Sequence, residues 1–455
     1  MVFYHLCYII ALDFYLFKMY LKRKVDIELE NWKQLSSRKP LILRGARQVG
    51  KSSSVRNLAL KFNYFIEINF DEDPIYASVF ESGLNPAAIC ERLSVISNTP
   101  IIEGETLLFF DEIQSCIPAI SSLRYFYEKM PNLHLIAAGS LLEFALSEIP
   151  SFGVGRVRSV FMYPLSFEEF LLANNENSLI EVLNKATTAA TFPEIFHQKL
   201  KTYLKKFLII GGMPEVVKNY VSNGDMLEVQ KVLDDLILSI QVDFAKYKDR
   251  VSSSRIREVF DAVVKQVGTK FSYSYPNATL NNVQIKEALV LLDMAGLVYF
   301  VTHSASNGIP IGAEINSKKR KILLFDTGLF QRIQGLNIAQ LLVEDDFNSI
   351  NKGNIAELSV GLELIKNTSC YEKTQLYYWQ REAKNSQAEV DYVIQKQDKI
   401  IPIEVKAGTK GSMQSLYLFL EEKKLDFGIR LSLENFSEME KIKIIPLYGV
   451  RNILL

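Results

Sequence analysis

The chain has 455 residues, of which 48% are hydrophobic and 23% are charged, a composition typical of globular proteins with sizeable cores. Lysine plus arginine and aspartate plus glutamate both total 52, so bulk charge gives no evidence for nucleic-acid binding, which would need a local basic patch. The four cysteines and four histidines lack paired spacing, which argues against a disulfide framework or a zinc site and favours a reducing, cytoplasmic compartment.

Residues 1–18 form an apolar, aromatic N-terminal extension that Asp13 interrupts and that no basic residue precedes. It is shorter than the roughly 20 residues that a membrane span needs, and it lacks a small-residue cleavage site. One interpretation is a peripheral membrane anchor. The favoured one is a start assigned too far upstream, because a polar, helical pattern begins cleanly at Met19. We therefore expect no membrane association.

A glycine-rich loop then matches the pattern G-x-x-x-x-G-K-[ST] at every fixed position. It lies between residues 40–43, an expected buried strand, and residues 53–60, an expected helix. Such a unit directs backbone N–H groups at one point, where the helix N-terminus favours a phosphate. The residues expected to bind nucleotide are Gly45, Ala46, Arg47, Gln48, Val49, Gly50, Lys51, Ser52 and Ser53. Lys51 would reach the β and γ phosphates, and Ser52 would hold Mg²⁺.

Further apolar runs predict four more strands, with helical stretches between them. These runs cover residues 64–70, 106–110, 133–138 and 157–163. Strands that alternate with helices predict a parallel sheet covered on both faces. Asp111 and Glu112 directly follow the second of these runs, at the carboxyl end of a strand, where open parallel sheets bind ligands. Asp111 would hold Mg²⁺ through water, and Glu112 would polarise the attacking water.

Three more polar residues are candidates for the same site. Ser140 follows the next apolar run and could contact the γ phosphate or the water, although a plain helix N-cap explains it equally well. Arg156 and Arg158 precede the last run, after a loop at residues 150–155. A guanidinium there could serve as a finger arginine in a homo-oligomer, reaching a neighbour's nucleotide. The alternative is a solvated basic turn.

Several motifs stand in a recognisable order, namely the glycine-rich loop, Phe-Phe-Asp-Glu-Ile-Gln, Ala-Gly-Ser, Gly-Arg-Val-Arg and Gly-Gly-Met-Pro-Glu. From Met19 onward the chain resembles the prokaryotic ATPases that join an AAA-type domain to a C-terminal domain of unknown function. The resemblance implies ATP as the nucleotide, whereas the residues alone would also allow GTP. It also implies a helical lid, a winged-helix-like segment and a restriction-endonuclease-like terminal domain.

The predicted fold class is therefore α/β, with a P-loop NTPase parallel sheet at its centre. We expect the AAA-type core at residues 19–165, the helical lid at 166–250, the winged-helix-like segment at 251–330 and the restriction-endonuclease-like domain at 331–455.

Two alternating runs in the terminal domain, residues 389–394 and 400–406, predict a strand hairpin. Strand periodicity places Glu404 and Lys406 on one face, and pairing would bring Asp391 to Glu404. Two carboxylates form an oxygen site for Mg²⁺, and a lysine beside them can orient water, which is the D…ExK arrangement of restriction-endonuclease-like nucleases. Glu357, on an upstream helix, resembles the extra acid of many such folds. An ordinary cross-strand charge pattern remains the alternative.

A basic stretch at residues 317–321 lies next to the expected wing and could hold DNA phosphates, although such runs are often solvated turns and winged folds also dock proteins. Together the motifs predict a cytoplasmic, Mg²⁺-dependent ATPase that couples ATP hydrolysis to a C-terminal effector or docking module. Two alternatives remain: an ATP-regulated DNA-binding protein or nuclease acting at the D…ExK site, and a slow ATP switch that recruits a protein partner.

Overall fold

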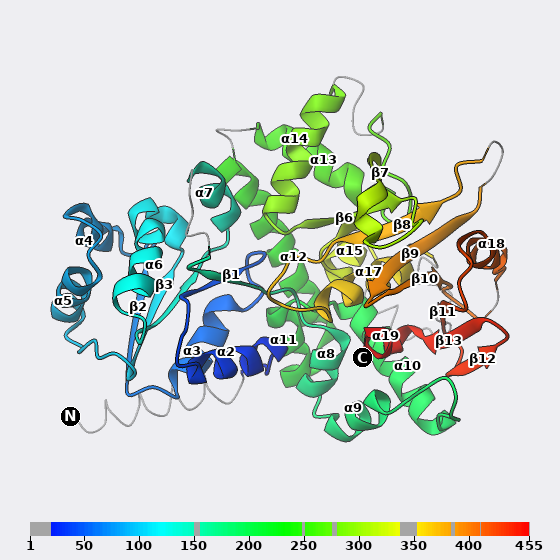
Figure 1. Ribbon diagram of the computed structural model, residues 1–455, viewed down its shortest axis with the longest axis horizontal. Coiled ribbons are helices and arrows are strands. Elements are labelled where there is room, and N and C mark those ends of the chain that lie inside the picture. The colour runs from blue at the N-terminus through cyan, green and yellow to red at the C-terminus, as the bar shows by residue number, and fades with distance from the viewer. Residues whose placement is uncertain are drawn as a thin grey trace. The chain divides into compact units, whose positions relative to one another are not determined.

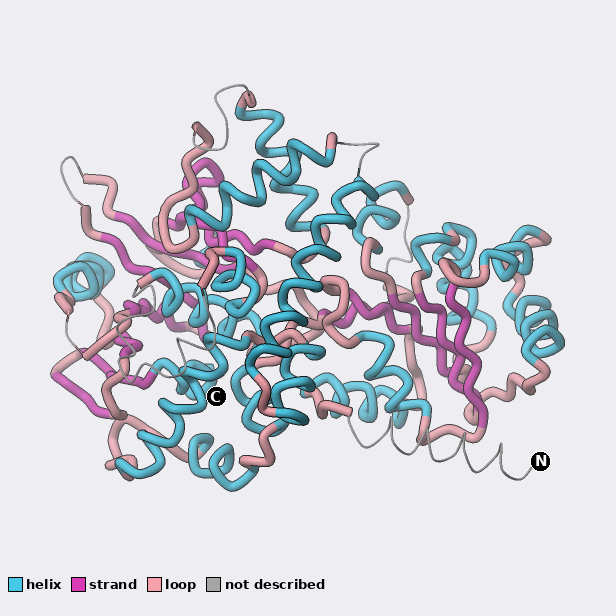
Figure 2. Tube along the Cα trace, turned by 180° about the vertical axis from the view of Figure 1, so that it is seen from behind, coloured by secondary structure: helices cyan, strands magenta, loops and turns pink. Residues whose placement is uncertain are grey.

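The computed structural model describes residues 20–149, 155–247, 251–274, 280–336, 353–383, 387–409 and 411–454. The N-terminal extension and residues 150–154 of the loop before Arg156 lie outside them. The chain divides into two compact units (Figures 1 and 2). The first unit runs to Tyr163 and also includes Cys370–Lys373, while the second comprises Pro164–Ser369 and Thr374–Leu455.

The described part of the first unit is built on a five-stranded, all-parallel sheet with the order β2-β3-β4-β1-β5. Its strands are β1 (Leu41–Arg44), β2 (Tyr64–Asn69), β3 (Thr106–Asp111), β4 (His134–Ala138) and β5 (Arg158–Phe161). Every residue of β3 and β4 is buried, as expected for central strands of a sheet with two covered faces. The predicted parallel sheet is confirmed, and β1 begins and ends one residue later than predicted.

Helices cover both faces of this sheet. They are α2 (Lys24–Gln34), α3 (Lys51–Ala59), α4 (Ser78–Glu81), α5 (Pro86–Ser97), α6 (Ile117–Lys129) and α7 (Leu142–Glu148). Helices α4 to α7 share one apolar cluster with residues from β1 to β4, among them Phe110 and Phe126. Helix α3 contacts β3 and β4 and packs against α2. The sheet positions the carboxyl ends of β1, β3 and β4 side by side, where the candidate site lies.

The second unit begins with helices. They are α8 (Phe167–Ala173), α9 (Asn177–Asn184), α10 (Glu194–Ile210), α11 (Pro214–Asn223), α12 (Met226–Asp243), α13 (Ser253–Gln266), α14 (Asn282–Met294) and α15 (Thr327–Ile333). The turn between α10 and α11 surrounds Asp326, which caps α15. Asp326 accepts hydrogen bonds from the Gly212 N–H at 2.7 Å and the Leu329 N–H at 3.0 Å. Gly211 has φ +80°, and a Cβ on it would clash with the Asp326 carboxylate, so the turn requires glycine.

Within the described residues, the second unit also holds a mixed eight-stranded sheet in the order β12-β13-β11-β10-β9-β8-β6-β7. Its elements are β6 (Val298–Ser304), β7 (Ile315–Leu324), β8 (Leu376–Gln380), β9 (Glu389–Lys396), β10 (Lys399–Val405), β11 (Gly428–Ser432), β12 (Ser437–Met439) and β13 (Ile442–Pro446), with helices α17 (Asn354–Lys366), α18 (Gln414–Lys423) and α19 (Val450–Leu454). Helix α18 packs on β9, β10 and β11, and α17 contacts β7 and β10.

Helices α13 and α14 contact the antiparallel hairpin β6–β7, which is the segment predicted as winged-helix-like. The hairpin does not stand apart, because β6 pairs in parallel with β8 and so continues into the C-terminal strands. The winged-helix-like and restriction-endonuclease-like assignments, with their boundaries, stay predictions. None of the described helices has both the length and the apolar composition that a membrane span requires.

Candidate functional site

The glycine-rich loop connects β1 to α3, as its sequence pattern predicts. Gly50 caps α3 with φ +97°, and Gly45 has φ +142°, a conformation that side chains rarely adopt. A Cβ on Gly45 would also clash with the carbonyl of Met162, so this end of the loop has room only for glycine. Ala46 and Val49 are buried and anchor the loop, whereas Arg47, Gln48 and Ser53 are exposed.

Lys51 is buried and folds back over the loop. Its ammonium donates hydrogen bonds to the carbonyls of Gly45 at 2.9 Å and Ala46 at 2.8 Å. Burial lowers its pKa to about 8, although the charges of Glu112 and Asp111 oppose this shift. Phosphate oxygens are stronger partners for an ammonium than neutral carbonyls are, so a bound phosphate could take these hydrogen bonds over.

Ser52 and Asp111 meet at the carboxyl end of β3. The Ser52 hydroxyl donates to Oδ2 of Asp111 at 2.7 Å, and the Glu112 N–H donates to Oδ1 at 3.0 Å. Burial raises the pKa of Asp111, and the hydrogen bond from Ser52 partly offsets that rise. A hydroxyl and a carboxylate in contact supply the hard oxygen ligands that Mg²⁺ prefers, so the two residues fit the predicted metal role.

The Glu112 carboxylate is fixed by donors from the ends of two strands. Its Oε2 accepts hydrogen bonds from the Gln114 amide at 2.6 Å, the Ser140 hydroxyl at 3.1 Å and the Ser140 N–H at 3.3 Å. Burial alone would raise the pKa of Glu112, but these hydrogen bonds and the charge of Lys51 outweigh it and lower the pKa. Glu112 is therefore an ionised carboxylate held in a fixed orientation, and Ser140 contacts it directly.

Gln114 is a site residue that the sequence analysis did not single out. It orients Glu112. Its side chain also explains why position 139 is glycine, because a Cβ on Gly139 would clash with the Gln114 Oε1 atom. The available signal was its place in the run Phe-Phe-Asp-Glu-Ile-Gln, three residues after the metal-binding candidate.

Both candidate finger arginines have partners within their own unit. Arg156 forms an ion pair with Glu128. The guanidinium of Arg158 lies 5.3 Å from the centre of the Tyr371 ring, and the Tyr371 hydroxyl donates to Glu28 at 2.7 Å. A role for either arginine across a subunit interface stays a prediction.

Comparison with known protein families identifies the domain that carries these residues. Residues 37–171 match the family described as an AAA domain, and this segment spans the glycine-rich loop and all five strands of the sheet. This chain carries an AAA domain. Residues 201–340 and 352–449 match two domains of unknown function, DUF8612 and DUF4143. The AAA domain thus provides an ATP-binding P-loop core, followed by two modules whose families have no assigned function.

One curated relative and two solved structures also show a likeness to the chain. The uncharacterized protein MJ1544 of Methanocaldococcus jannaschii is 25% identical over 82% of this chain and 75% of its own length. The Walker-type ATPase paby2304 of Pyrococcus abyssi is 16% identical, with a TM-score of 0.43 over 71% of this chain and 96% of its own. Aeropyrum pernix ORC1, solved in complex with DNA, is 12% identical, with a TM-score of 0.24 over 71% and 93%. Both TM-scores are low, so neither structure adds to the assignment of the AAA domain.

Beyond the AAA domain, the D…ExK residues lie on the predicted hairpin. Strands β9 and β10 pair in antiparallel register, with Ile403 opposite Tyr392. The Val405 N–H donates to Oδ2 of Asp391 at 2.8 Å, and Lys406 forms an ion pair of 2.6 Å with Oε1 of Glu404. Burial, reinforced by the charge of Asp391, raises the pKa of Glu404.

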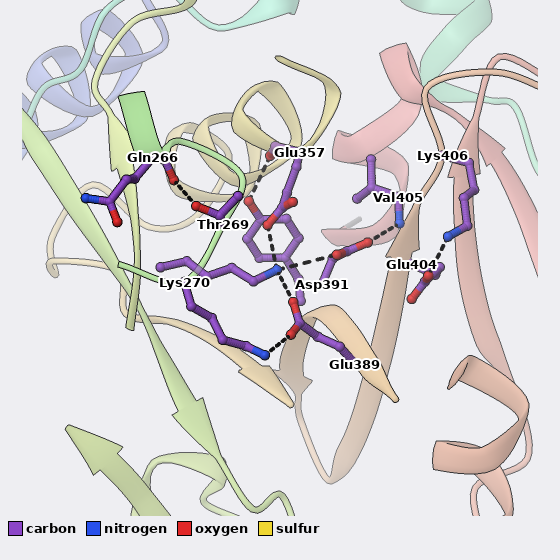
Figure 3. A network of polar contacts seen from close by, with 11 residues as sticks. Gln266, Thr269, Lys270, Glu357, Glu389, Asp391, Glu404, Val405 and Lys406 are labelled. Carbon is purple, nitrogen blue, oxygen red and sulfur yellow. Dashed lines mark hydrogen bonds and ion pairs between the residues drawn. The ribbon is translucent and has the colours of Figure 1, made fainter. Parts of the chain in front are cut away.

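Glu357, on α17, contacts this cluster through Lys321, which was expected to belong to a basic stretch beside the wing. Lys321 forms ion pairs with Glu357 at 2.8 Å and with Glu389 at 2.6 Å, and Lys270 contacts the other oxygen of Glu389 at 2.8 Å. In Figure 3 the Glu357, Glu389 and Asp391 side chains point toward one another. Lys321, Lys270 and Glu389 were not predicted, and the signal for Lys321 was its position directly before the apolar run Ile-Leu-Leu-Phe.

The basic stretch beside the predicted wing is only partly a surface feature. Lys321 is buried in the carboxylate cluster, Lys319 pairs with Glu382 at 2.8 Å, and the guanidinium of Arg320 lies 4.6 Å from the centre of the Phe300 ring. The interpretation of this stretch as a row of DNA-contacting cations is therefore wrong for Lys321, because its ammonium points into the protein. DNA contact elsewhere stays a prediction.

Proposed function

We propose that this protein is a Mg²⁺-dependent ATPase of the AAA type. The observation that carries the proposal is the contact between Ser52 and Asp111 at 2.7 Å beside the oriented Glu112 carboxylate. These residues lie beside the glycine-rich loop. The loop would bind phosphate, Ser52 and Asp111 would bind the cation, and Glu112 would act as the base. An ATP-binding domain with all three has the groups that hydrolysis of the γ phosphate needs.

The residues of the chain divide the work by their chemistry. The loop N–H groups and the Lys51 ammonium would bind the phosphates, and Ser52 and Asp111 would hold Mg²⁺, which supplies Lewis-acid stabilisation of charge on the transferred phosphoryl group. Glu112 is ionised and would accept a hydrogen bond from the attacking water, orienting it and polarising it. Gln114 and Ser140 act through Glu112, since both hold its Oε2 atom.

The test compares variants of the purified full chain in ATP binding and in phosphate release. We expect Lys51→Ala to lose nucleotide binding, and Glu112→Gln to bind ATP but turn it over at least about 100-fold more slowly, in the range that loss of a general base costs. Glu72→Gln, an exposed acid of the same unit, is the matched control. Normal turnover by Glu112→Gln would remove Glu112 as the base, and tight ATP binding without turnover by the wild type would favour a slow switch.

Coupling to the C-terminal module is the second part of the proposal, and the path of the chain supports it. Residues Cys370–Lys373 belong to the first unit, although stretches of the second unit flank them on both sides in sequence. The Phe161 N–H, at the end of β5, donates to the Cys370 carbonyl at 2.7 Å, and Arg158 packs on Tyr371. A movement of β5 during the ATP cycle would therefore be passed directly to the chain at Ser369 and Thr374.

Hydrogen exchange with and without ATP tests this coupling. We expect amide protection in the stretch after Thr374 to change on ATP binding in the wild type, and the change to disappear in Tyr371→Ala, which removes the contacts to Arg158 and Glu28. Tyr417→Ala, at an exposed tyrosine of α18, is the control. A response that persists in Tyr371→Ala would show that this segment is not the route.

A further inference from the structure

We infer that the Lys321 ammonium takes the place of a divalent cation in the C-terminal carboxylate cluster, so that this cluster binds no metal while Lys321 is present. The inference is independent of ATP hydrolysis, because all of its residues belong to the second unit. It assigns the D…ExK residues a role as an internal ion-pair network rather than as a nuclease centre.

The Lys321 ammonium occupies the position between the carboxylates that a bound cation would need. Its Nζ atom lies 2.8 Å from Glu357 Oε1, 2.6 Å from Glu389 Oε1 and 3.5 Å from Asp391 Oδ1. An ammonium has three N–H donors, and here three carboxylate oxygens surround it. The side chain is only 2% exposed, so water does not compete for these contacts. Burial alone would lower the pKa of Lys321, but the three carboxylates raise it and keep the ammonium charged.

Three more carboxylate oxygens of the cluster are occupied as well. Asp391 Oδ2 accepts from the Val405 N–H, Glu404 Oε1 pairs with Lys406, and Glu389 Oε2 pairs with Lys270. The Oε2 atom of Glu404 is buried and has no hydrogen-bond partner among the residues that the structure describes. Mg²⁺ requires near-octahedral oxygen coordination, and these ion pairs would have to break to provide it. Consistently, no group of three or more metal-ligating side chains among the residues described is arranged to hold a metal ion.

The charge balance indicates what would follow if Lys321 were removed. Four carboxylates, those of Glu357, Glu389, Asp391 and Glu404, face three lysines in this network. Burial raises the pKa values of both Glu357 and Glu404, as expected where acids outnumber the cations near them. Removal of the Lys321 charge would leave four carboxylates and only two lysines. A divalent cation could then balance the two excess negative charges. The cluster is thus a latent metal site that Lys321 fills.

Mn²⁺ binding to the nucleotide-free full chain tests the inference, with free Mn²⁺ measured by electron paramagnetic resonance. The variants are Asp391→Asn, Lys321→Ala and the double variant, and any Mn²⁺ at the P-loop is common to all of them. We expect wild type and Asp391→Asn to bind the same amount. Lys321→Ala should bind one additional equivalent, which the double variant should lose. A wild-type Mn²⁺ site that Asp391→Asn abolishes would overturn the inference, as would a folded Lys321→Ala protein with no additional site.

Loss of the Lys321 charge leaves buried carboxylates uncompensated, so a second measurement covers a variant that folds poorly. We expect Mn²⁺ to raise the unfolding midpoint of Lys321→Ala by more than it raises that of the wild type. Lys270→Ala should respond as the wild type does, because Lys270 contacts only Glu389 among the four acids. A third test uses the wild-type protein and does not depend on whether a Lys321 variant folds. Incubation of wild type with plasmid DNA and Mg²⁺ or Mn²⁺, with and without ATP, should give no cleavage. Cleavage that Asp391→Asn or Glu404→Gln removes would overturn the inference.

Discussion

The Ser52 hydroxyl donates a hydrogen bond of 2.7 Å to Oδ2 of Asp111, although the two residues are 59 positions apart in the chain. Ser52 stands in the first turn of α3 and Asp111 at the last position of β3, so the packing of α3 on the parallel sheet brings them together. The pair places two oxygen atoms beside the glycine-rich loop, which supports the proposed cation site there.

Removal of the Ser52 hydroxyl should weaken Mg²⁺ binding more than ATP binding. We expect Ser52→Ala to raise the Mg²⁺ concentration for half-maximal ATP turnover roughly tenfold, which corresponds to about 1.4 kcal/mol of lost metal binding. Ser52→Thr keeps the hydroxyl and should behave as wild type. A Mg²⁺ titration of phosphate release measures the effect, and an unchanged midpoint in Ser52→Ala would show that this hydroxyl is not a ligand.

The Gln114 side chain leaves no space for a side chain at position 139, so substitutions of these two residues should depend on each other. Gly139→Ala should push the Gln114 side chain away from Glu112 and reduce kcat by about 10- to 100-fold, as loss of a correctly oriented base does. Gln114→Ala should cause a similar loss. The double variant should be no slower than Gln114→Ala, because the shortened side chain leaves space for the new methyl group. Additive losses in the double variant would contradict this packing relationship.

His134 should make the protein less stable in mild acid. The ring lies against Trp32 and Phe62, its Nδ1 accepts from Arg38 at 3.0 Å, and burial lowers its pKa from 6.5 to about 4. Between these two values the unfolded chain binds a proton that the folded chain rejects, so stability falls as the pH decreases from 6.5 toward about 4. Thermal unfolding from pH 7.5 to 4.5 should show this decline, and it should be smaller in His134→Gln. Parallel declines in the two proteins would refute the assignment.

Asp326 should contribute more to stability than an ordinary helix cap. Asp326→Ala would leave the buried N–H groups of Gly212 and Leu329 without acceptors, and we expect a loss of about 2–4 kcal/mol in the free energy of unfolding. Asp225→Ala removes the exposed cap of α12 and should cost about 1 kcal/mol. Denaturant unfolding compares the two variants, and equal losses would mean that burial of Asp326 adds nothing.

The sequence was most informative where function follows local order along the chain. Asp111 could be placed at the end of a buried strand, with Glu112 directly after it, because both follow an apolar run. Lys51 could be placed at the start of a helix because it follows the glycine-rich loop. The hairpin of β9 and β10 was predictable for the same reason, since its alternation and its turn are contiguous. The α/β fold class with its parallel sheet followed from these local patterns.

Contacts between distant segments were not accessible in this way. Gln114 fills the space above Gly139 only because β3 and β4 are neighbours, a fact that periodicity does not encode. Lys321 stands beside three other basic residues and has the sequence context of a solvated turn. Its burial depends on α17 and β9, which follow it in the chain and which carry the acids Glu357 and Glu389. The negative charge around Lys321 therefore comes from tertiary contacts and cannot be read from the neighbouring sequence.

The route of the chain also limits how the molecule can be divided. The backbone leaves the first unit after Tyr163, returns at Cys370 and leaves again after Lys373. A single proteolytic cut before Pro164 would therefore not release an intact P-loop unit, because the fragment would lack the Cys370 carbonyl that the N–H of Phe161 contacts. Strand β5 is the edge of its sheet, and its exposed end would be free to pair with other chains and promote aggregation. A gene fragment that ends near residue 163 is thus a poor candidate for independent expression.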